Sequence, residues 1–313
     1  MKLRRKLRWT LAALAVAAAL AAIVVPLAIR GPGEVALPLP PGADSAADRP
    51  APTISVMTLN LAHGRGEGFH QTFQKRTTIE AHLDRVAEVL RRERPDVAAF
   101  QEADGPSVWS GNFNHVDYLA EAAEYPSRFR GEHVRGLGLS YGTAIVSRLP
   151  AAEAVSFTFA ANPPTPSKGF VVARYSWPGP SGFEFDVASV HLDFSRASVR
   201  RTQVEKLAGE LAKRGKPLVV LGDFNCGWPD QGSPVRALAE RLGLKAYRPD
   251  GRDLATYPST GRRLDWVLIA PPLEFVEYKV LPDAVSDHRA VVAVLRIGEG
   301  SPPRPATSRG RMQ

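Results

Sequence analysis

The chain has 313 residues, 44% of them hydrophobic, and no internal repeat, so it can bury one large core or two modest ones and is not fibrous. Its single cysteine, Cys226, excludes an intramolecular disulfide and a cysteine-based metal cluster. The net charge of +8 lies mostly at the ends: residues 1–50 carry seven basic and three acidic groups, residues 298–313 carry three and one, and the segment between them has 30 Lys and Arg against 28 Asp and Glu. This distribution argues against a strongly basic nucleic-acid-binding surface on the folded part.

The amino terminus has the pattern of a membrane anchor. Several basic residues within the first eight positions precede Leu11 to Ile29, an Ala- and Leu-rich run without charge that is interrupted only by Pro26. About 19 helical residues at about 1.5 Å each just span a hydrocarbon core of about 30 Å. The basic flank predicts a cytoplasmic N-terminus, which places the chain after Arg30 outside the cytoplasm. The alternative is a cleaved signal peptide, which would make the protein secreted. The apolar run is, however, longer than the hydrophobic region of a usual signal peptide, and no clear A-x-A cleavage site follows it.

Two further segments have the composition of unpacked chain. Residues 31–52 are rich in Pro, Gly, Ala and Asp, which predicts an extended linker. Residues 298–313 have the character of a disordered tail. The expected organisation is a basic flank with a transmembrane anchor over 1–30, a linker over 31–52, one folded domain over 53–297 and a tail over 298–313.

The folded part begins with strand and helix patterns in alternation. They are a strand over Thr53–Asn60, a helix over Gln74–Arg94 and a buried strand over Asp96–Gln101 that is followed by Glu102. This order predicts an α/β arrangement. Residues 103–142 combine one expected helix, near Val116 to Ala123, with long loops of a kind that is usually functional in a compact domain.

The second half contains further strands and helices. In chain order we expect a strand over Thr143–Ser147, a hairpin of Phe170–Trp177 and Phe183–His191, a helix over Ser195–Lys213, a strand over Pro217–Asn225, a helix over Ser233–Leu242, and strands over Leu264–Ile269, Glu274–Leu281 and Ala290–Ile297. In PLVVLGDFN, an apolar run leads through Gly222 to Asp223 and Asn225. Residues i and i+2 of a strand point the same way, so this carboxylate and carboxamide face one small volume that suits a water held against a phosphate. A simple turn is the alternative.

Polar side chains gather at the ends of these strands. In chain order they are Asn60, Glu102, His191, Asp223, Asn225, Asp265, Asp287 and His288. Singly, each has an ordinary structural explanation: a turn or cap, a surface carboxylate, or a hydrogen-bonded core histidine. Their joint occurrence favours an active site. The remaining histidines of the folded part include His63, His70, His115 and His133, which are expected in loops, and Asn112 to His115 are candidates for the wall of a substrate cleft.

The motifs TLN, QE, VHLD, GDFN, LDWVL and SDH occur in this order within residues 53–297. In that order they resemble the endonuclease/exonuclease/phosphatase superfamily, the DNase I-like fold. The resemblance implies a four-layer α/β sandwich, in which two mixed β-sheets pack face to face with helices outside and the strand ends meet at one site. It also implies hydrolysis of a phosphate ester with a divalent cation, usually Mg²⁺, with Mn²⁺ or another divalent cation as alternatives. Hard cations prefer oxygen ligands, which fits this set of side chains.

The resemblance also implies a role for each acidic or amide side chain near the ion. Glu102 would be the principal metal ligand, with Asn60 and Asp287 close to the metal. Asp223 would orient or deprotonate the attacking water, and Asn225 would hold water or a phosphoryl oxygen.

The histidines would stabilise the negative charge on the phosphate. Asp265 would pair with His288 and favour its protonated ring, and His191 would donate a hydrogen bond to the phosphate or act as general acid. Several nuclease members place a phosphate-contacting tyrosine before a G-x-x-x-x-S-R element; here Tyr141 directly precedes Gly142, one position too close, which puts that role in doubt and disfavours an abasic-site nuclease.

The anchor and the nearly neutral domain favour a membrane substrate, a phosphodiester or phosphomonoester such as a phospholipid. One alternative is an extracytoplasmic endonuclease or exonuclease that acts on nucleic acid. A second is a catalytically inactive, membrane-tethered binding module. The expected partners are therefore the phosphate-ester substrate, lipid or nucleic acid, and the membrane through the N-terminal helix; no obligate protein partner is inferred.

Overall fold

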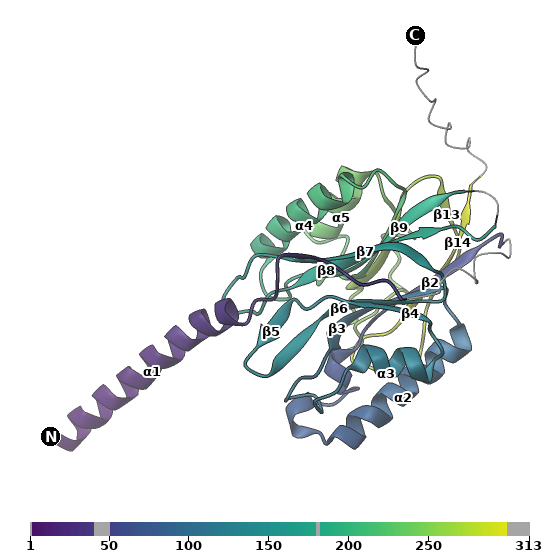
Figure 1. Cartoon of the computed structure of the whole chain (residues 1–313). Helices are drawn as coiled ribbons and strands as arrows, with labels where there is room; N and C mark the ends of the chain where they lie inside the picture. The colour runs from purple at the N-terminus through teal and green to yellow at the C-terminus, as the bar shows by residue number, and fades with distance from the viewer. Residues whose placement is uncertain (1, 41–50, 180–181, 299–313) are drawn as a thin grey trace, which may run out of the picture.

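Two mixed β-sheets pack face to face in the computed structural model, which describes residues 2–40, 51–179 and 182–298 (Figure 1). The first sheet contains β2 (Ile54–Asn60), β3 (Val97–Asp104), β4 (Ser127–Arg130), β5 (Val134–Gly136), β6 (Leu139–Ser147), β13 (Leu273–Val280) and β14 (Val291–Ile297). The second sheet contains β1 (Glu34–Ala36), β7 (Ala151–Thr158), β8 (Gly169–Ser176), β9 (Glu184–His191), β10 (Leu218–Asp223), β11 (Lys245–Ala246) and β12 (Asp265–Ile269). Their strand orders are β13-β14-β2-β3-β6-β4, with β5 beside β6, and β1-β7-β8-β9-β10-β12-β11.

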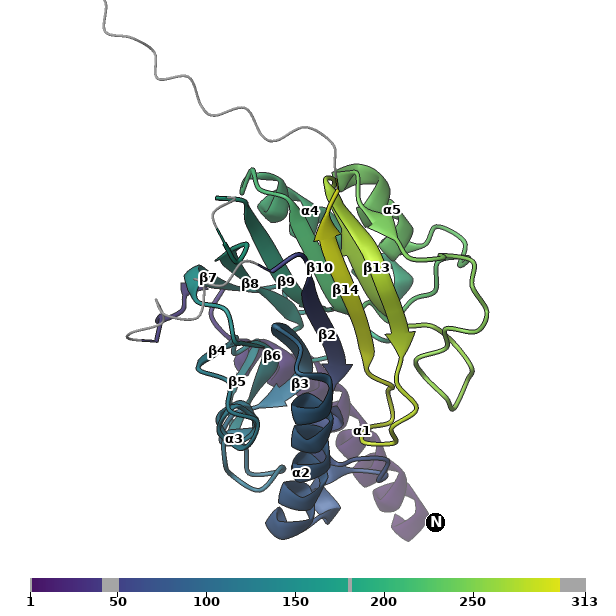
Figure 2. The same ribbon diagram turned by 90° about the vertical axis from the view of Figure 1, so that its right-hand side faces the viewer.

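Helices cover the outer face of each sheet, so the predicted four-layer α/β sandwich is confirmed (Figure 2). Helices α2 (Arg76–Glu93) and α3 (His115–Ala122) pack on the first sheet, while α4 (Ala197–Ala212) and α5 (Pro234–Leu242) pack on the second. The predicted hairpin and the strands that carry GDFN and LDWVL all form within a few residues of the expected bounds.

The core follows from the alternation of apolar side chains along each strand. Val56 lies between the sheets, whereas its neighbour Met57 lies under α2. In the second sheet Leu221 faces the first sheet and Val220 faces α4. Strands with both faces buried must be apolar at successive positions. Each such side chain contributes about 1.5–3 kcal/mol on burial.

Helix α2 shows how local sequence ends an element. Ile79, Leu83 and Leu90 recur at helical spacing and are fully buried. The helix stops at Glu93 because Arg94 takes a left-handed conformation, at φ 44°, and its N–H returns to the carbonyl of Leu90. Pro95 then prevents continuation.

Helix α1 (Lys2–Ala28) precedes the sandwich and projects away from it (Figure 1). Its stretch Thr10–Ala28, 19 residues, has the length and composition to cross a membrane, a property shared with signal sequences. The predicted linker is wrong in part, because Glu34–Ala36 forms β1 and pairs with Ser156 and its neighbours on β7. The strand forms because its backbone pairs with the open edge of β7, although the composition of this segment does not favour a strand. Residues 41–50 and the tail 299–313 lie outside the described residues, so those parts of the linker and tail predictions are untested.

The segment 103–142 is more regular than predicted. It contains α3, β4, β5 and the start of β6, a nine-residue strand of which only Thr143–Ser147 was expected. Gly142 and the polar residue Ser140 conceal the beginning of this strand, whose backbone pairs with three neighbours. Strand β7 gave no clear sequence signal either, and it forms because β8 offers an antiparallel partner.

Candidate active site

Strand pairing brings three of the polar residues side by side in the second sheet. Asp223 ends β10, which runs parallel to β9 and antiparallel to β12. In this register Asp223 is paired with His191 on one side and with Asp265 on the other. The end of two strands and the beginning of a third therefore meet at one point of a mixed sheet.

Glu102 reaches the same place through a β-bulge. The pairing of β3 with β6 shifts between Phe100 and Ala103, and Glu102 has φ 48°, a left-handed conformation that is unusual for a residue with a side chain. The expectation that Glu102 follows the strand is wrong, since it lies inside β3. A bulge turns a side chain out of the regular alternation. Asn225, at φ 52°, shares this conformation, and such strain concentrates at functional sites.

The carboxylate of Asp223 is surrounded by donors. The Asn60 amide nitrogen donates to Oδ2 at 3.0 Å, and Asn225 donates its backbone N–H to Oδ1 at 2.9 Å and its side-chain amide to Oδ2 at 3.2 Å. The Nε2 atoms of His191 and His288 lie 3.6 Å and 3.8 Å from Oδ2. Despite these partners, burial raises the pKa of Asp223 to about 7, with the negative charge of Asp265 adding to the effect. This carboxylate therefore exchanges protons near neutral pH.

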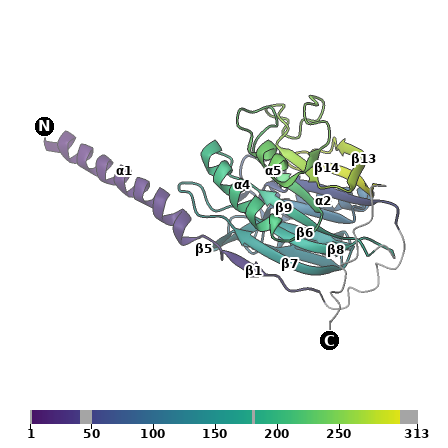
Figure 3. The ribbon, with the colours of Figure 1, turned by 90° about the horizontal axis from the view of Figure 1, so that it is seen from above.

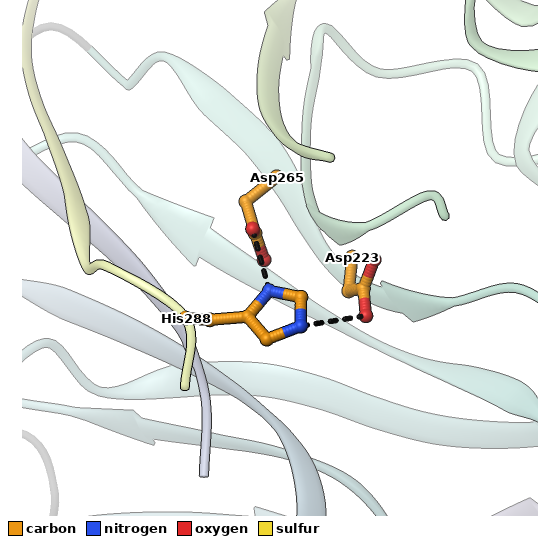
Figure 4. A group of neighbouring side chains, drawn as sticks. All are labelled: Asp223, Asp265 and His288. Atoms are coloured by element: carbon orange, nitrogen blue, oxygen red, sulfur yellow. Dashed lines mark hydrogen bonds and ion pairs between the residues drawn. The ribbon is translucent and has the colours of Figure 1, made fainter. Parts of the chain in front are cut away.

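His288 lies between two carboxylates (Figure 4). Its Nδ1 donates to Asp265 Oδ2 at 2.8 Å, and the same oxygen accepts a 2.6 Å hydrogen bond from Thr256. Burial alone would lower the pKa of His288, but Asp265 and Asp223 outweigh it and raise this pKa to about 10. The ring is therefore protonated at neutral pH, and its Nε2–H points toward Asp223.

Three cationic side chains that the sequence reasoning missed surround Glu102. His63 Nε2 lies 3.4 Å from Oε2, Arg65 Nη1 lies 3.7 Å from Oε2, and Lys168 Nζ lies 3.7 Å from Oε1. Burial raises the pKa of this carboxyl, but the positive charges of His63 and Lys168, with the smaller contribution of Arg65, lower it well below its usual range. Glu102 is thus ionised under all ordinary conditions.

His63 is not the loop residue that was expected. It is buried, and Asp104 Oδ1 accepts a 2.6 Å hydrogen bond from its Nδ1, which leaves Nε2 facing Glu102. His115 and His133 are also buried, His115 in α3 and His133 between Thr143 and Thr158. The position of His63, three residues after Asn60 at a strand end, was the available signal.

Lys168 fixes the protonation of His191. Its ammonium, which can only donate, lies 3.5 Å from His191 Nδ1, so the ring proton is on Nε2. Burial, with the charge of Lys168, lowers the pKa of His191 well below its usual range, and the ring is neutral. His191 therefore presents a neutral N–H donor toward Asp223.

A cavity of about 370 Å³ opens onto these groups. Seven of the eight predicted residues line it: Asn60, Glu102, His191, Asp223, Asn225, Asp287 and His288. Asp265 lies behind His288 as its partner. Arg65, Phe194, Tyr257, Thr260, Arg262 and Leu264 complete the wall. Tyr141 is buried against His63 at a ring distance of 4.9 Å and does not line the cavity.

Two groups of side chains have the chemistry to hold a metal ion. One ligand atom from each of Asp223, Asp265 and His288 lies within 4.8 Å of the others. A protonated His288 that is bonded to Asp265 has no free lone pair for a metal, which disfavours this group. Glu102 and Asp287 both contact the guanidinium of Arg65, so two carboxylates face one cation near Asn60. This all-oxygen set fits a hard divalent cation.

Comparisons with known proteins agree with this fold. Residues 57–288 match the sequence profile of the family described as "Endonuclease/Exonuclease/phosphatase family". No curated protein matches the sequence.

Solved structures share the fold at low sequence identity. An endonuclease/exonuclease/phosphatase from Beutenbergia cavernae is 22% identical with a TM-score of 0.63, over 79% of this chain and 72% of that one. The human Nocturnin catalytic domain is 19% identical with a TM-score of 0.58, over 79% and 94%. A mannosyl-6-phosphatase from Bacteroides thetaiotaomicron is 18% identical with a TM-score of 0.56, over 77% and 99%.

Proposed function

Because the chain belongs to the endonuclease/exonuclease/phosphatase family, we propose that it is a divalent-metal-dependent hydrolase of phosphate esters that acts outside the cytoplasm at the membrane surface. The observation that carries this proposal is the convergence of seven side chains from widely separated segments around one cavity. An assembly of buried carboxylates, amides and histidines costs stability, which a binding module without catalysis has no reason to retain.

Asp223 is the general base of the proposed reaction. Its pKa of about 7 allows it to accept a proton from water at neutral pH, and its position in the cavity wall lets it reach that water. Asn60 and Asn225 hold the carboxylate in place. Asn225 also donates to the carbonyl of Leu192, so its amide orientation is fixed.

Glu102 and Asp287, with Asn60 beside them, would hold the divalent cation, Mg²⁺ in the first instance. When bound, the cation supplies positive charge that stabilises the transition state of phosphoryl transfer. The always-ionised Glu102 meets the requirement for a metal ligand.

The two histidines are the donors to the phosphate. His288 is an imidazolium whose charge Asp265 maintains, and it opposes the negative charge that accumulates on the phosphoryl oxygens. His191 contributes a neutral Nε2–H hydrogen bond, and its low pKa disfavours the alternative role of general acid.

The proposed substrate is a phosphodiester of a phospholipid headgroup. The apolar Thr10–Ala28 stretch of α1 supports a membrane location with the N-terminus in the cytoplasm, and the nearly neutral charge of the domain disfavours a long nucleic acid. A second cavity, of about 480 Å³, adjoins the first at Arg262 and has Trp228 and Arg252 in its wall. Its size suits the group attached to the phosphate.

The test is a substrate panel with the full chain in detergent and in vesicles. The panel contains bis-p-nitrophenyl phosphate, plasmid DNA and phospholipid vesicles, each with Mg²⁺ and with EDTA. Asp223→Ala and His288→Ala should abolish turnover, whereas Glu240→Gln, at an exposed carboxylate on α5 that lines neither cavity, should not. Cleavage of DNA with inert vesicles would replace the lipid proposal by a nuclease, and no turnover on any substrate would favour the binding module.

A further inference from the structure

Helix α1 is joined to the folded domain without a free linker. Ile29, which follows the last helical residue, is buried, and its carbonyl accepts a 2.7 Å hydrogen bond from the N–H of Arg135. The guanidinium of Arg30 donates to the carbonyls of Phe159 and Thr158 at 3.0 Å and 3.3 Å. The chain that leaves α1 is therefore bonded to strands of both sheets. A bilayer around Thr10–Ala28 would bring its headgroups against the residues next to Ile29.

Two exposed apolar side chains lie at this point. Gly136 lies beside Ile29, since a Cβ atom at Gly136 would be 3.4 Å from Ile29 Cγ2, and the next residue, Leu137, is 72% exposed. Val108 is 69% exposed, and its N–H donates to the carbonyl of Gly138 at 2.9 Å. Leu137 and Val108 thus form neighbouring apolar projections where α1 meets the domain.

Two exposed phenylalanines extend the same surface. Phe69 is 92% exposed and Phe73 is 80% exposed. His70 links Phe73 to the residues near the end of α1, because its ring lies 5.8 Å from that of Phe73 and 6.0 Å from that of Trp109, and Phe69 directly precedes His70 in the chain. Trp109 packs against the small buried cluster of Ile29, Val134 and Tyr141 and stacks on the Tyr141 ring at 5.3 Å.

We call Phe69, Phe73, Val108 and Leu137 the foot patch. Six large apolar side chains are exposed in the described residues after position 50, and four of them belong to this patch. A fifth, Phe194, lines the catalytic cavity, and the sixth, Val276, lies on β13 at the other side of the molecule from α1 (Figure 3). Clustered exposure of this kind marks an interaction surface.

The foot patch borders the candidate active site. Tyr141 packs with Ile29 and lies 4.9 Å from the His63 ring, and His63 contacts Glu102. Arg65, in the cavity wall, begins the loop that carries Phe69 and Phe73, and its guanidinium donates to the carbonyl of Gly68 at 3.1 Å. Only two side chains therefore separate the exit of α1 from the proposed metal ligand.

We propose that the foot patch is a bilayer-docking surface that inserts at the boundary of headgroups and acyl chains of the membrane in which α1 is anchored. This inference rests on the membrane location of the proposed function and deepens it. The occupant is a phospholipid bilayer, because the helix that positions the patch is itself apolar over bilayer length and leaves the domain beside it. Docking holds the catalytic cavity against the lipid headgroups. The substrate is then limited to phosphate esters that lie at the depth of the headgroups in the bilayer.

The test measures lipid contact at single positions and does not require catalysis. Leu137→Cys and Phe73→Cys are each labelled with an environment-sensitive fluorophore in the full chain, which is then reconstituted into vesicles of phosphatidylcholine and phosphatidylglycerol. The native Cys226 is fully buried and stays unlabelled. Val276→Cys is the matched control, since Val276 is 52% exposed on the distant strand β13.

We expect lipids that carry a spin label near the headgroup end of the acyl chain to quench positions 137 and 73 at least twofold and to leave position 276 unchanged. Quenching at 137 and 73 that does not exceed that at 276 overturns the proposal. Self-quenching between labelled copies in place of quenching by lipid also overturns it and assigns the patch to a second copy of the chain. Lipid contact in a protein that hydrolyses no substrate would refute the proposed function alone, whereas turnover without lipid contact would refute the docking surface alone.

Discussion

The side-chain amide of Asn60 donates a 3.0 Å hydrogen bond to the carboxylate of Asp223, and this bond joins the end of β2 in one sheet to the end of β10 in the other. The proposed base is therefore positioned by the packing of the two sheets as well as by its own strand. Both residues are buried, so the bond is not exchanged with water.

Loss of this bridge should slow catalysis without unfolding the protein. Asn60→Ala removes the donor from the other sheet and leaves the Asp223 carboxylate held by Asn225 alone, so we expect kcat for bis-p-nitrophenyl phosphate to fall about 10- to 100-fold. Asn162→Ala, at an asparagine whose amide bonds only the nearby carbonyl of Ala160, is the control and should keep the wild-type rate. An unchanged kcat in Asn60→Ala would show that the bridge does not position the base.

Metal removal should abolish turnover and lower stability together. A ligand that binds only the folded state stabilises it by about 2.7 kcal/mol at 100 times its dissociation constant, so Mg²⁺ should raise the Tm and EDTA should reverse the shift. Glu102→Gln should lose both the Tm shift and the activity. Glu80→Gln, at an α2 carboxylate that pairs with Arg76, should retain both. A full Tm shift in Glu102→Gln would place the ion elsewhere, such as at Asp223 and Asp265.

The glycine of the GDFN motif is required by the packing of β10 on β9. Gly222 has φ +147°, and a Cβ atom there would lie 2.0 Å from the carbonyl oxygen of Val190. Gly222→Ala must push the two strands apart, and we expect it to lower the free energy of unfolding by about 3 kcal/mol or more. Gly209, within α4, has open space at its Cβ position, so Gly209→Ala should raise that free energy by about 0.5–1 kcal/mol. Urea unfolding in mild detergent measures both changes, and equal effects of the two substitutions would contradict this account.

Stability should fall with acidification, and His133 is one of the buried histidines with a lowered pKa that cause this fall. Burial lowers the pKa of this histidine to about 3, while in the unfolded chain it titrates near 6.5. Between these two pKa values the unfolded chain binds a proton at His133 and the folded protein does not. The free energy of unfolding is therefore unaffected by this group above about pH 6.5, and it falls below that pH by up to about 1.4 kcal/mol per pH unit. His133→Gln keeps a hydrogen-bonding group between Thr143 and Thr158 and should flatten this dependence between pH 6.5 and 5. A slope in His133→Gln as steep as that of the wild type would exclude His133 as a source of the pH dependence.

The segment between α1 and β2 should matter for folding. A chain that begins at Ile29 keeps the buried Ile29, the hydrogen bonds of Arg30 and strand β1, whereas a chain that begins at Ala51 loses all three. Loss of β1 exposes the edge of β7, and exposed edges promote aggregation. We expect the longer chain to be more soluble and to have a higher Tm. Equal behaviour of the two would show that β1 contributes nothing to stability.

The sequence predicted the two sheets and most of the site because the relevant signals are local. A strand that ends in Asp223 or Asn60 can be recognised from its own apolar run, and the order of the motifs then indicated one fold. The register that pairs Asp223 with both His191 and Asp265 follows from the fold, which explains why these residues meet.

The surroundings of Glu102 could not be predicted in the same way. Lys168 reaches Glu102 because Gly169 pairs with His191 at the start of β8, and this register cannot be deduced from the sequence of either strand alone. The bulge that turns Glu102 inward is a backbone feature without a glycine to reveal it. His63 depends on Asp104, forty-one positions away, for its orientation.

The hydroxyl of Ser286 donates a 2.7 Å hydrogen bond to the carbonyl of Asn60, a residue 226 positions earlier, and β14, which follows Ser286, is paired between β2 and β13. Strand β2 and the last strand, β14, are thus neighbours although they are far apart in the chain, and contacts between such distant positions form slowly. On the proposed topology the domain crosses the membrane with its amino-terminal strands first, so the residues around Asp287 and His288 arrive last. On that topology, a chain in transit has no complete catalytic centre on either side of the membrane.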